Sequence, residues 1–213
     1  MAAAASSNNP LVQIATGYVN YIDTLFSKFK YKIVYPNLTQ STDDGLYPFM
    51  LYHNKTYVGV IVIAPFVGED ANRPGPVING EKTIITNVLH IHTLAIDNPK
   101  YQRMGLATIL ILYSICCCYL INQDFHYVTL DDTTNPGVDI YKKLDFMPLN
   151  NSIMNAPEKY TTISTLIGVT LPKMQQPTKL TEMQAQPNAN MNAGTRKTRR
   201  YRKKQRKTRR YRR

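Results

Sequence analysis

A strand, a short polar turn and a very apolar helix follow one another between residues 83 and 121. An extended, strand-like run reaches from Thr83 to Asp97, and an almost unbroken apolar run extends from about Met104 to Ile121. A helix that is apolar on every side is stable only inside a core. We therefore expect the rest of the chain to fold around this strand–turn–helix unit.

The turn inside this unit has the residue types of an anion site. It reads Gln102-Arg103-Met104-Gly105-Leu106-Ala107. The first turn of a helix presents backbone N–H groups that lack intrahelical partners, at the positive end of the helix dipole. Gly105 has no Cβ, so a ligand can approach the backbone closely there. This arrangement predicts a pocket for a phosphate or pyrophosphate.

Two further segments accompany the turn. Residues 90–96 read His-Ile-His-Thr-Leu-Ala-Ile, and residues 140–146 read Ile-Tyr-Lys-Lys-Leu-Asp-Phe. Gln102, Gly105 and Ala107 fit a Gln/Arg-x-x-Gly-x-Gly/Ala loop. Together the three segments resemble the GCN5-related N-acetyltransferase superfamily. The strand is similar to the His-x-His-x-Leu-Ala-Val strand of its arylalkylamine (serotonin) N-acetyltransferase branch, and the last segment to its Tyr-Glu-Lys-Leu-Gly-Phe signature.

The resemblance implies an α/β domain over residues 1–172, with a mixed, mostly antiparallel sheet, a V-shaped splay at its central strands and flanking helices. Local patterns predict the other elements: a helix from 10 to 30, strands at 31–35, 47–53, 56–64, 125–130, 146–149 and 160–171, and a short helix at 138–144. Residues 65–82 predict a loop, either a flap on the substrate side or a plain surface loop. The loop at 37–46 is the other expected substrate wall.

The superfamily implies a direct attack of an amine on the thioester of acetyl-CoA. Backbone groups freed at the splay, at Leu94, Ala95 and Ile96, are then expected to hold the pantetheine arm and to face the thioester carbonyl. The turn is expected to hold the pyrophosphate through Gln102, Arg103, Met104, Gly105, Leu106, Ala107 and Thr108. Asn135 corresponds to an asparagine near the pantetheine.

Three side chains are candidates for proton transfer. His90 and His92 lie two residues apart on a strand, so their side chains project from the same face. Imidazole titrates near neutral pH, and the resemblance implies that His92, with His90 behind it, drains the proton of the amine. The alternative is two histidines held by local hydrogen bonds. Tyr141 matches the tyrosine that protonates the CoA thiolate, the alternative being a core tyrosine. No third ligand is spaced to complete a two-histidine metal site, so we expect no metal.

Positive charge is concentrated at the end of the sequence. Residues 195–213 hold 13 of the 26 basic residues and no acid, which leaves 13 basic against 14 acidic residues elsewhere. Such a segment repels itself and is expected to be disordered when free. Its arginines and lysines suit a polyanion, nucleic acid above all; a localisation signal and an anionic membrane surface are the alternatives. The Gln-, Asn- and Pro-rich residues 173–194 predict a flexible linker.

The three cysteines stand together at 116–118, inside the apolar helix. Neighbours on a helix point about 100° apart and cannot pair with one another, so we expect small core residues and an intracellular protein, cytoplasmic or nuclear. Leu106–Ile121 is shorter than the roughly 20 residues of a membrane span. Met1–Asn9 lacks the basic and apolar regions of a secretory signal.

These patterns predict an acetyl-CoA-dependent N-acetyltransferase whose acceptor is an amine. Two alternatives stay open. One is a protein acetyltransferase that acts on lysines or N-termini of nucleic-acid-associated targets. The other is a catalytically idle domain of the same fold that serves as a nucleic-acid-binding module.

Overall fold

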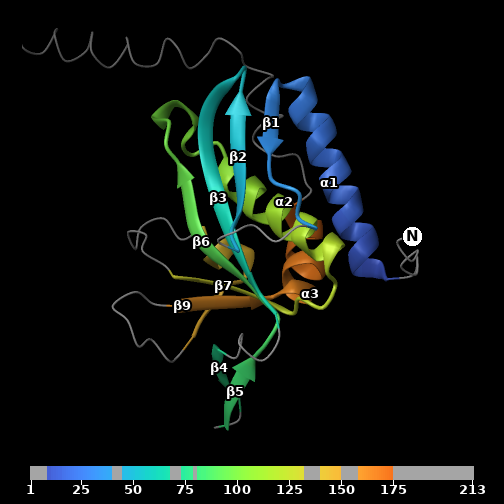
Figure 1. The fold of residues 1–213 in the computed structure, drawn as a ribbon, viewed down its shortest axis with the longest axis vertical. Coiled ribbons are helices and arrows are strands. Elements are labelled where there is room, and N and C mark those ends of the chain that lie inside the picture. Colours follow the sequence, from blue (N-terminus) through green and yellow to red (C-terminus); the bar gives the residue numbers. More distant parts are fainter. Residues whose placement is uncertain are drawn as a thin grey trace, which may run out of the picture. The chain divides into compact units, whose positions relative to one another are not determined.

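The computed structural model describes residues 9–39, 45–67, 73–78, 81–131, 140–149 and 158–174, which all fall in the unit Met1–Gln176. Their main feature is a seven-stranded sheet in the order β1-β2-β3-β6-β7-β9-β8 (Figure 1). Its strands are β1 (Tyr31–Val34), β2 (Tyr47–His53), β3 (Thr56–Phe66), β6 (Val88–Ile96), β7 (Tyr127–Asp131), β8 (Met147–Pro148) and β9 (Glu158–Thr162). Within this sheet β6 and β7 are parallel and the other neighbours antiparallel. The predicted mixed, mostly antiparallel sheet is confirmed.

The parallel pair exists because the helix α2 (Leu106–Ile121) crosses over between β6 and β7. Twelve of its 16 residues are buried, and it lies against β2, β3 and β6. The apolar helix is therefore the core element that the sequence predicts. In a strand–helix–strand unit the C-terminal ends of the strands and the N-terminus of the helix lie at the same edge of the sheet. This edge carries the candidate site.

Two further helical segments pack against α2. The helix α1 (Pro10–Lys28) begins at Asn9, whose side chain accepts a hydrogen bond of 3.0 Å from the Leu11 N–H. The Tyr113 hydroxyl of α2 donates to Asp23 of α1 over 2.8 Å. The segments α3 (Ile163–Thr165), η4 (Leu166–Thr170) and α4 (Leu171–Met174) continue one another, and η4 contacts α1 and α2.

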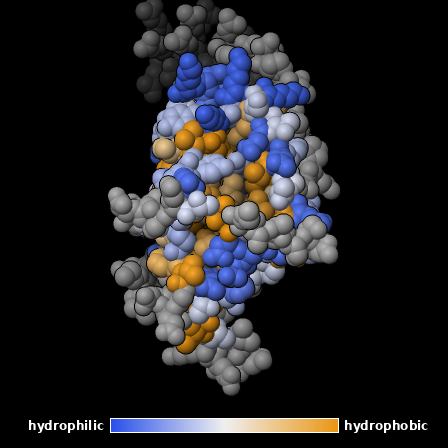
Figure 2. Space-filling model, turned by 45° about the vertical axis from the view of Figure 1, so that its right-hand side comes forward, coloured by the Kyte–Doolittle hydropathy of each residue, from blue (hydrophilic) through white to orange (hydrophobic). Residues whose placement is uncertain are grey.

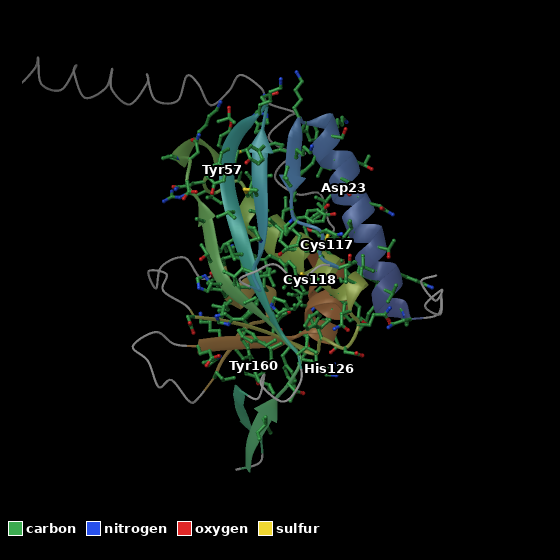
Figure 3. All side chains as sticks on the ribbon, in the orientation of Figure 1. Asp23, Tyr57, Cys117, Cys118, His126 and Tyr160 are labelled. Atoms are coloured by element: carbon green, nitrogen blue, oxygen red, sulfur yellow. The ribbon has the colours of Figure 1, made fainter. Side chains whose placement is uncertain are left out.

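The cysteines lie inside this helical layer, as Figure 3 shows for Cys117 and Cys118. All three are buried and free. Burial, followed by the nearby Asp23 carboxylate, raises the pKa of Cys117 to about 12, so its thiol stays protonated at neutral pH. They serve as small apolar packers. No helix among the described residues is both long and apolar enough to cross a membrane.

The long strand predicted from Thr83 to Asp97 is wrong in one respect. The chain forms two strands, β5 (Glu81–Ile85) and β6, which are separated at Asn87 by a left-handed backbone with φ of 53°. Asparagine tolerates this conformation better than most residues, so the chain can change direction there. The predicted loop at 65–82 is also corrected, because β3 runs on to Phe66 and β4 (Arg73–Ile78) pairs with β5 as a separate two-stranded sheet.

The C-terminal part of the domain departs from the predicted strand at 160–171. Strand β9 ends at Thr162, whose hydroxyl accepts a hydrogen bond of 3.1 Å from the Thr165 N–H and so begins a helix. Of the short helix expected at 138–144, the described part is the 3₁₀ turn η3 (Lys142–Leu144). Apart from the last two residues of α4, the predicted linker and the basic tail lie outside the described residues.

We predict that Gly59→Ala and Gly17→Ala change stability in opposite directions. A Cβ on Gly59 would collide with the Ala95 carbonyl oxygen of β6, whereas one on Gly17, inside α1, would meet nothing within 4 Å. Gly59→Ala should lower the free energy of unfolding by about 1–3 kcal/mol through overpacking. Gly17→Ala should raise it by about 0.5–1 kcal/mol. Chemical denaturation measures both, and equal effects would contradict the close approach of β3 and β6.

Candidate active site

The two parallel strands separate at the edge where both of them end. Strand β7 pairs with β6 from Val88 to Ile91 only, whereas β3 accompanies β6 as far as Ile96. Beyond Ile91, the described residues give β6 no strand neighbour on the β7 side. The predicted V-shaped splay is therefore present, and Leu94, Ala95 and Ile96, each half-buried, form its open edge.

The open edge is shaped by its other neighbour, β3. The register between β3 and β6 shifts at Val62/Ile63, so that His92 is an extra residue on β6 with no partner in the ladder. Such bulges bend a strand and redirect its side chains. Further along, Gly59 lets β3 lie close to the Ala95 carbonyl group. The missing side chain thus sets the position of the backbone at the open edge.

The turn after β6 folds back onto the end of that strand. It contains the 3₁₀ turn η2 (Pro99–Tyr101), and the Gln102 side-chain amide donates a hydrogen bond of 3.1 Å to the Ile96 carbonyl oxygen. Arg103, with φ of 63°, and Gly105, with φ of 79°, both take the left-handed conformation that reverses the chain. This bond assigns Gln102 a positioning role that its motif alone did not indicate.

The N-terminus of α2 is open. Gly105 is its N-cap residue and offers no side-chain hydrogen bond, in contrast to Asn9 at the start of α1. The first backbone bond into the cap runs from the Ile109 N–H to the Gly105 carbonyl over 3.1 Å. Three residues of the helix precede Ile109: Leu106, Ala107 and Thr108. Their backbone N–H groups therefore lack an acceptor within the helix. A Cβ on Gly105 would meet nothing within 4 Å, so there is free space beside this residue, and an anion is favoured at a helix N-terminus.

His90 lies at the base of the splay. It is 7% exposed, its Nδ1 lies 2.9 Å from the Thr129 hydroxyl, and its Nε2 lies 4.0 Å from an Asp131 carboxylate oxygen. The Phe66 ring packs edge-on against it at 6.3 Å. A carboxylate near one nitrogen and a hydroxyl beside the other fix the orientation of the imidazole.

His92 differs from His90 in its surroundings. It is exposed, and its Nδ1 lies 3.0 Å from the Thr93 hydroxyl. The two histidines therefore offer one buried and one surface position along β6, whereas the resemblance implied His92 as the first member of a proton path with His90 behind it. That path stays a prediction.

Tyr141 is buried beside β9. Its ring packs edge-on against Phe146 at 5.7 Å, and the Lys159 Nζ lies 5.7 Å from its centre. In the turn after Tyr141, Asp145 stands where the resembled signature has glycine. Asp145 takes the left-handed conformation, with φ of 57°, and its carboxylate accepts a hydrogen bond from the Thr170 hydroxyl. The acid role of Tyr141 stays a prediction, and Asn135 lies outside the described residues.

Sequence reasoning missed Thr129 and Asp131. The first is one polar residue in the predicted strand at 125–130, and the second follows directly after that strand. The available signal was position, since Asp131 ends a strand parallel to and beside the central one. The described residues hold no cluster of three or more His, Cys, Asp or Glu that could bind a metal ion.

No family model and no curated protein matches the sequence. Among solved structures, AtaTR bound with acetyl-CoA is similar at 14% identity and a TM-score of 0.47, over 64% of this chain and 96% of that one. The PaiA N-acetyltransferase of Thermoplasma acidophilum in complex with coenzyme A is similar at 13% identity and a TM-score of 0.39, over 55% and 61%. Arabidopsis thaliana Naa50, in complex with a bisubstrate analogue of CoA, is similar at 18% identity and a TM-score of 0.38, over 54% and 71%.

We predict that Gly105→Asp weakens acetyl-CoA binding while Gly45→Asp does not. Both glycines have a left-handed backbone, with φ of 79° and 65°, and both face open space, so the two substitutions carry similar strain and the same charge. Only Gly105→Asp places a carboxylate at the start of α2, where it would repel a pyrophosphate. Calorimetric titration should show at least a roughly tenfold loss of affinity for that variant. Equal affinities in both variants would place the ligand elsewhere.

Proposed function

We propose that this chain is an acetyl-CoA-dependent N-acetyltransferase of the GCN5-related type. The observation that carries the proposal is the splay of β6 from β7 within one strand–helix–strand unit whose helix begins without a cap. An open strand edge and an uncapped helix start, joined by one turn, suit an elongated ligand with an amide-bearing arm and a pyrophosphate. Acetyl-CoA has both, and it supplies an activated acyl group as a thioester.

The backbone is the expected binding element. Peptide groups of Leu94, Ala95 and Ile96 would form strand-like hydrogen bonds with the pantetheine arm. The N–H groups at the start of α2 would hold the pyrophosphate, and the open space at Gly105 gives it room. Arg103, exposed in the same turn, would add a positive charge. Placed in this way, the thioester would lie toward the base of the splay, on the side of His90.

The proton transfers fall to side chains around the splay. An acceptor amine forms a bond to the thioester carbonyl carbon, the carbon–sulfur bond breaks, and the nitrogen loses one proton. His90 would accept that proton, with Asp131 stabilising the imidazolium and His92 leading toward solvent. Tyr141 would return a proton to the thiolate. Thr129 would hold the imidazole in place through its bond to Nδ1.

A panel of amines and peptides assayed by CoA release tests the activity and identifies the acceptor class. Turnover of small amines alone supports the amine acetyltransferase, and turnover of lysine or N-terminal peptides alone supports the protein acetyltransferase. Binding of acetyl-CoA without turnover of any acceptor would support the idle module and contradict the proposal.

We predict that His90→Gln lowers kcat about 10²-fold, whereas His126→Gln leaves it unchanged. A general base contributes on this order, and His126 is an exposed histidine outside the splay that serves as the matched control. The wild-type rate should rise with pH as the base loses its proton, and this rise should disappear in His90→Gln. Asp131→Asn should lower kcat and move the rise without abolishing it. Identical pH–rate profiles for wild type and His90→Gln would refute the assignment of the base.

A further inference from the structure

Six exposed cations gather at the end of the domain where the β2–β3 hairpin turns. They come from three segments that are distant in sequence: the end of α1 with the start of β1, the hairpin turn, and the turn after β6. We call them the basic edge: Lys28, Lys30, Lys32, Lys55, Lys100 and Arg103. Figure 1 places all three segments at its upper end, and Figure 2 shows hydrophilic side chains gathered there.

Direct contacts hold the three segments together. The Asn54 N–H donates to the Lys30 carbonyl oxygen over 3.0 Å, which joins the hairpin turn to the end of α1. His53 Nδ1 lies 2.9 Å from the Tyr101 hydroxyl, which joins the hairpin to the turn after β6. The Tyr31 ring packs against the His53 ring at 4.4 Å, and both tyrosines are buried. The segments that carry the charged side chains are therefore held together by the packed rings of Tyr31, His53 and Tyr101.

The charge of the basic edge is poorly balanced by acids. Within the described parts of these three segments the one carboxylate is Asp97, and it accepts a hydrogen bond from the Tyr57 hydroxyl. Burial lowers the pKa of His53 below its ordinary value, and the positive charges of Lys100 and Lys30 lower it further. The field at the centre of the edge is therefore positive, which favours an anionic partner.

We propose that the basic edge binds the phosphate backbone of a nucleic acid, as a site of the folded domain that is separate from the basic tail. Cations from three segments can contact successive phosphates, which is how such backbones are bound. Tyr57, 40% exposed beside the edge, offers a ring for a base to stack on. A membrane surface fits less well, because the more exposed apolar side chains lie on other elements: Val67, Ile84, Ile121, Met147 and Val169. This proposal does not depend on the acetyltransferase activity, because Arg103, which is also assigned to the pyrophosphate, is left unchanged in the test and the other five cations have no role in that activity.

The test compares two double variants of the full chain that lose the same charge. Lys55→Gln/Lys100→Gln removes two cations of the basic edge, and Lys143→Gln/Lys173→Gln removes two exposed lysines on η3 and α4. The probe is an unstructured single-stranded RNA of about 20 nucleotides, titrated by fluorescence anisotropy at several salt concentrations. Thermal unfolding of each variant confirms that it folds.

The edge variant should bind the RNA about tenfold more weakly at physiological salt, with a salt slope smaller by about 1–1.5, and the control variant should match the wild type. Both variants keep the basic tail, so a difference in RNA affinity between them reports binding by the folded domain. Equal slopes in wild type and both variants would show that the tail alone binds RNA and would overturn the proposal. So would a loss of binding to phosphatidylserine vesicles with unchanged RNA binding, since that result marks a membrane surface.

Discussion

The parting of two parallel strands governs the architecture of this domain. Strand β6 keeps β3 as its neighbour to Ile96 but loses β7 after Ile91. A buried strand normally pairs its backbone groups on both sides, so an edge opened inside a sheet suits a ligand that supplies the missing hydrogen bonds. Gly59 keeps β3 in place beside this edge, and Gln102 ties the following turn to its end. Gly59 adds no side chain at this edge, and Gln102 occupies one of its backbone acceptors, the Ile96 carbonyl oxygen.

The two long helices differ in the residue that caps their N-terminus. At the start of α1, Asn9 satisfies a backbone N–H with its own side chain. At the start of α2, Gly105 provides no such bond and takes a left-handed conformation that other residues rarely adopt. An Asn or Ser cap would stabilise a helix by roughly 1 kcal/mol. Its absence at the one helix that follows the open strand is consistent with a site kept free for an anion.

Sequence predicted best those features that depend on neighbouring residues. The start of the first helix at residue 10, the division between the strands at 47–53 and 56–64, and the apolar run of α2 rest on local signals, and all three are present in the structure. Features that depend on distant contacts were missed or wrong. The break at Asn87 separates β6 from β5, which pairs with β4, and η4 in the helical segment after Thr162 packs against α1 and α2.

The same distinction holds for the candidate site. The glycine turn and the histidines could be found from motifs, because each motif lies within a few consecutive residues. The partners of His90 could not, because Thr129 and Asp131 lie on a strand that reaches it only through the crossover of α2. The tie from Gln102 to Ile96 likewise became visible only in the folded chain.

Hydrogen exchange of the backbone amides, with and without acetyl-CoA, tests the central claim most directly. If the ligand bridges the open strand edge and the helix start, exchange should slow at residues 93–97 and at residues 105–109, while α1 keeps its rate. Binding of acetyl-CoA with unchanged exchange in both segments would contradict the account, because the splay and the start of α2 would then not be where the ligand lies.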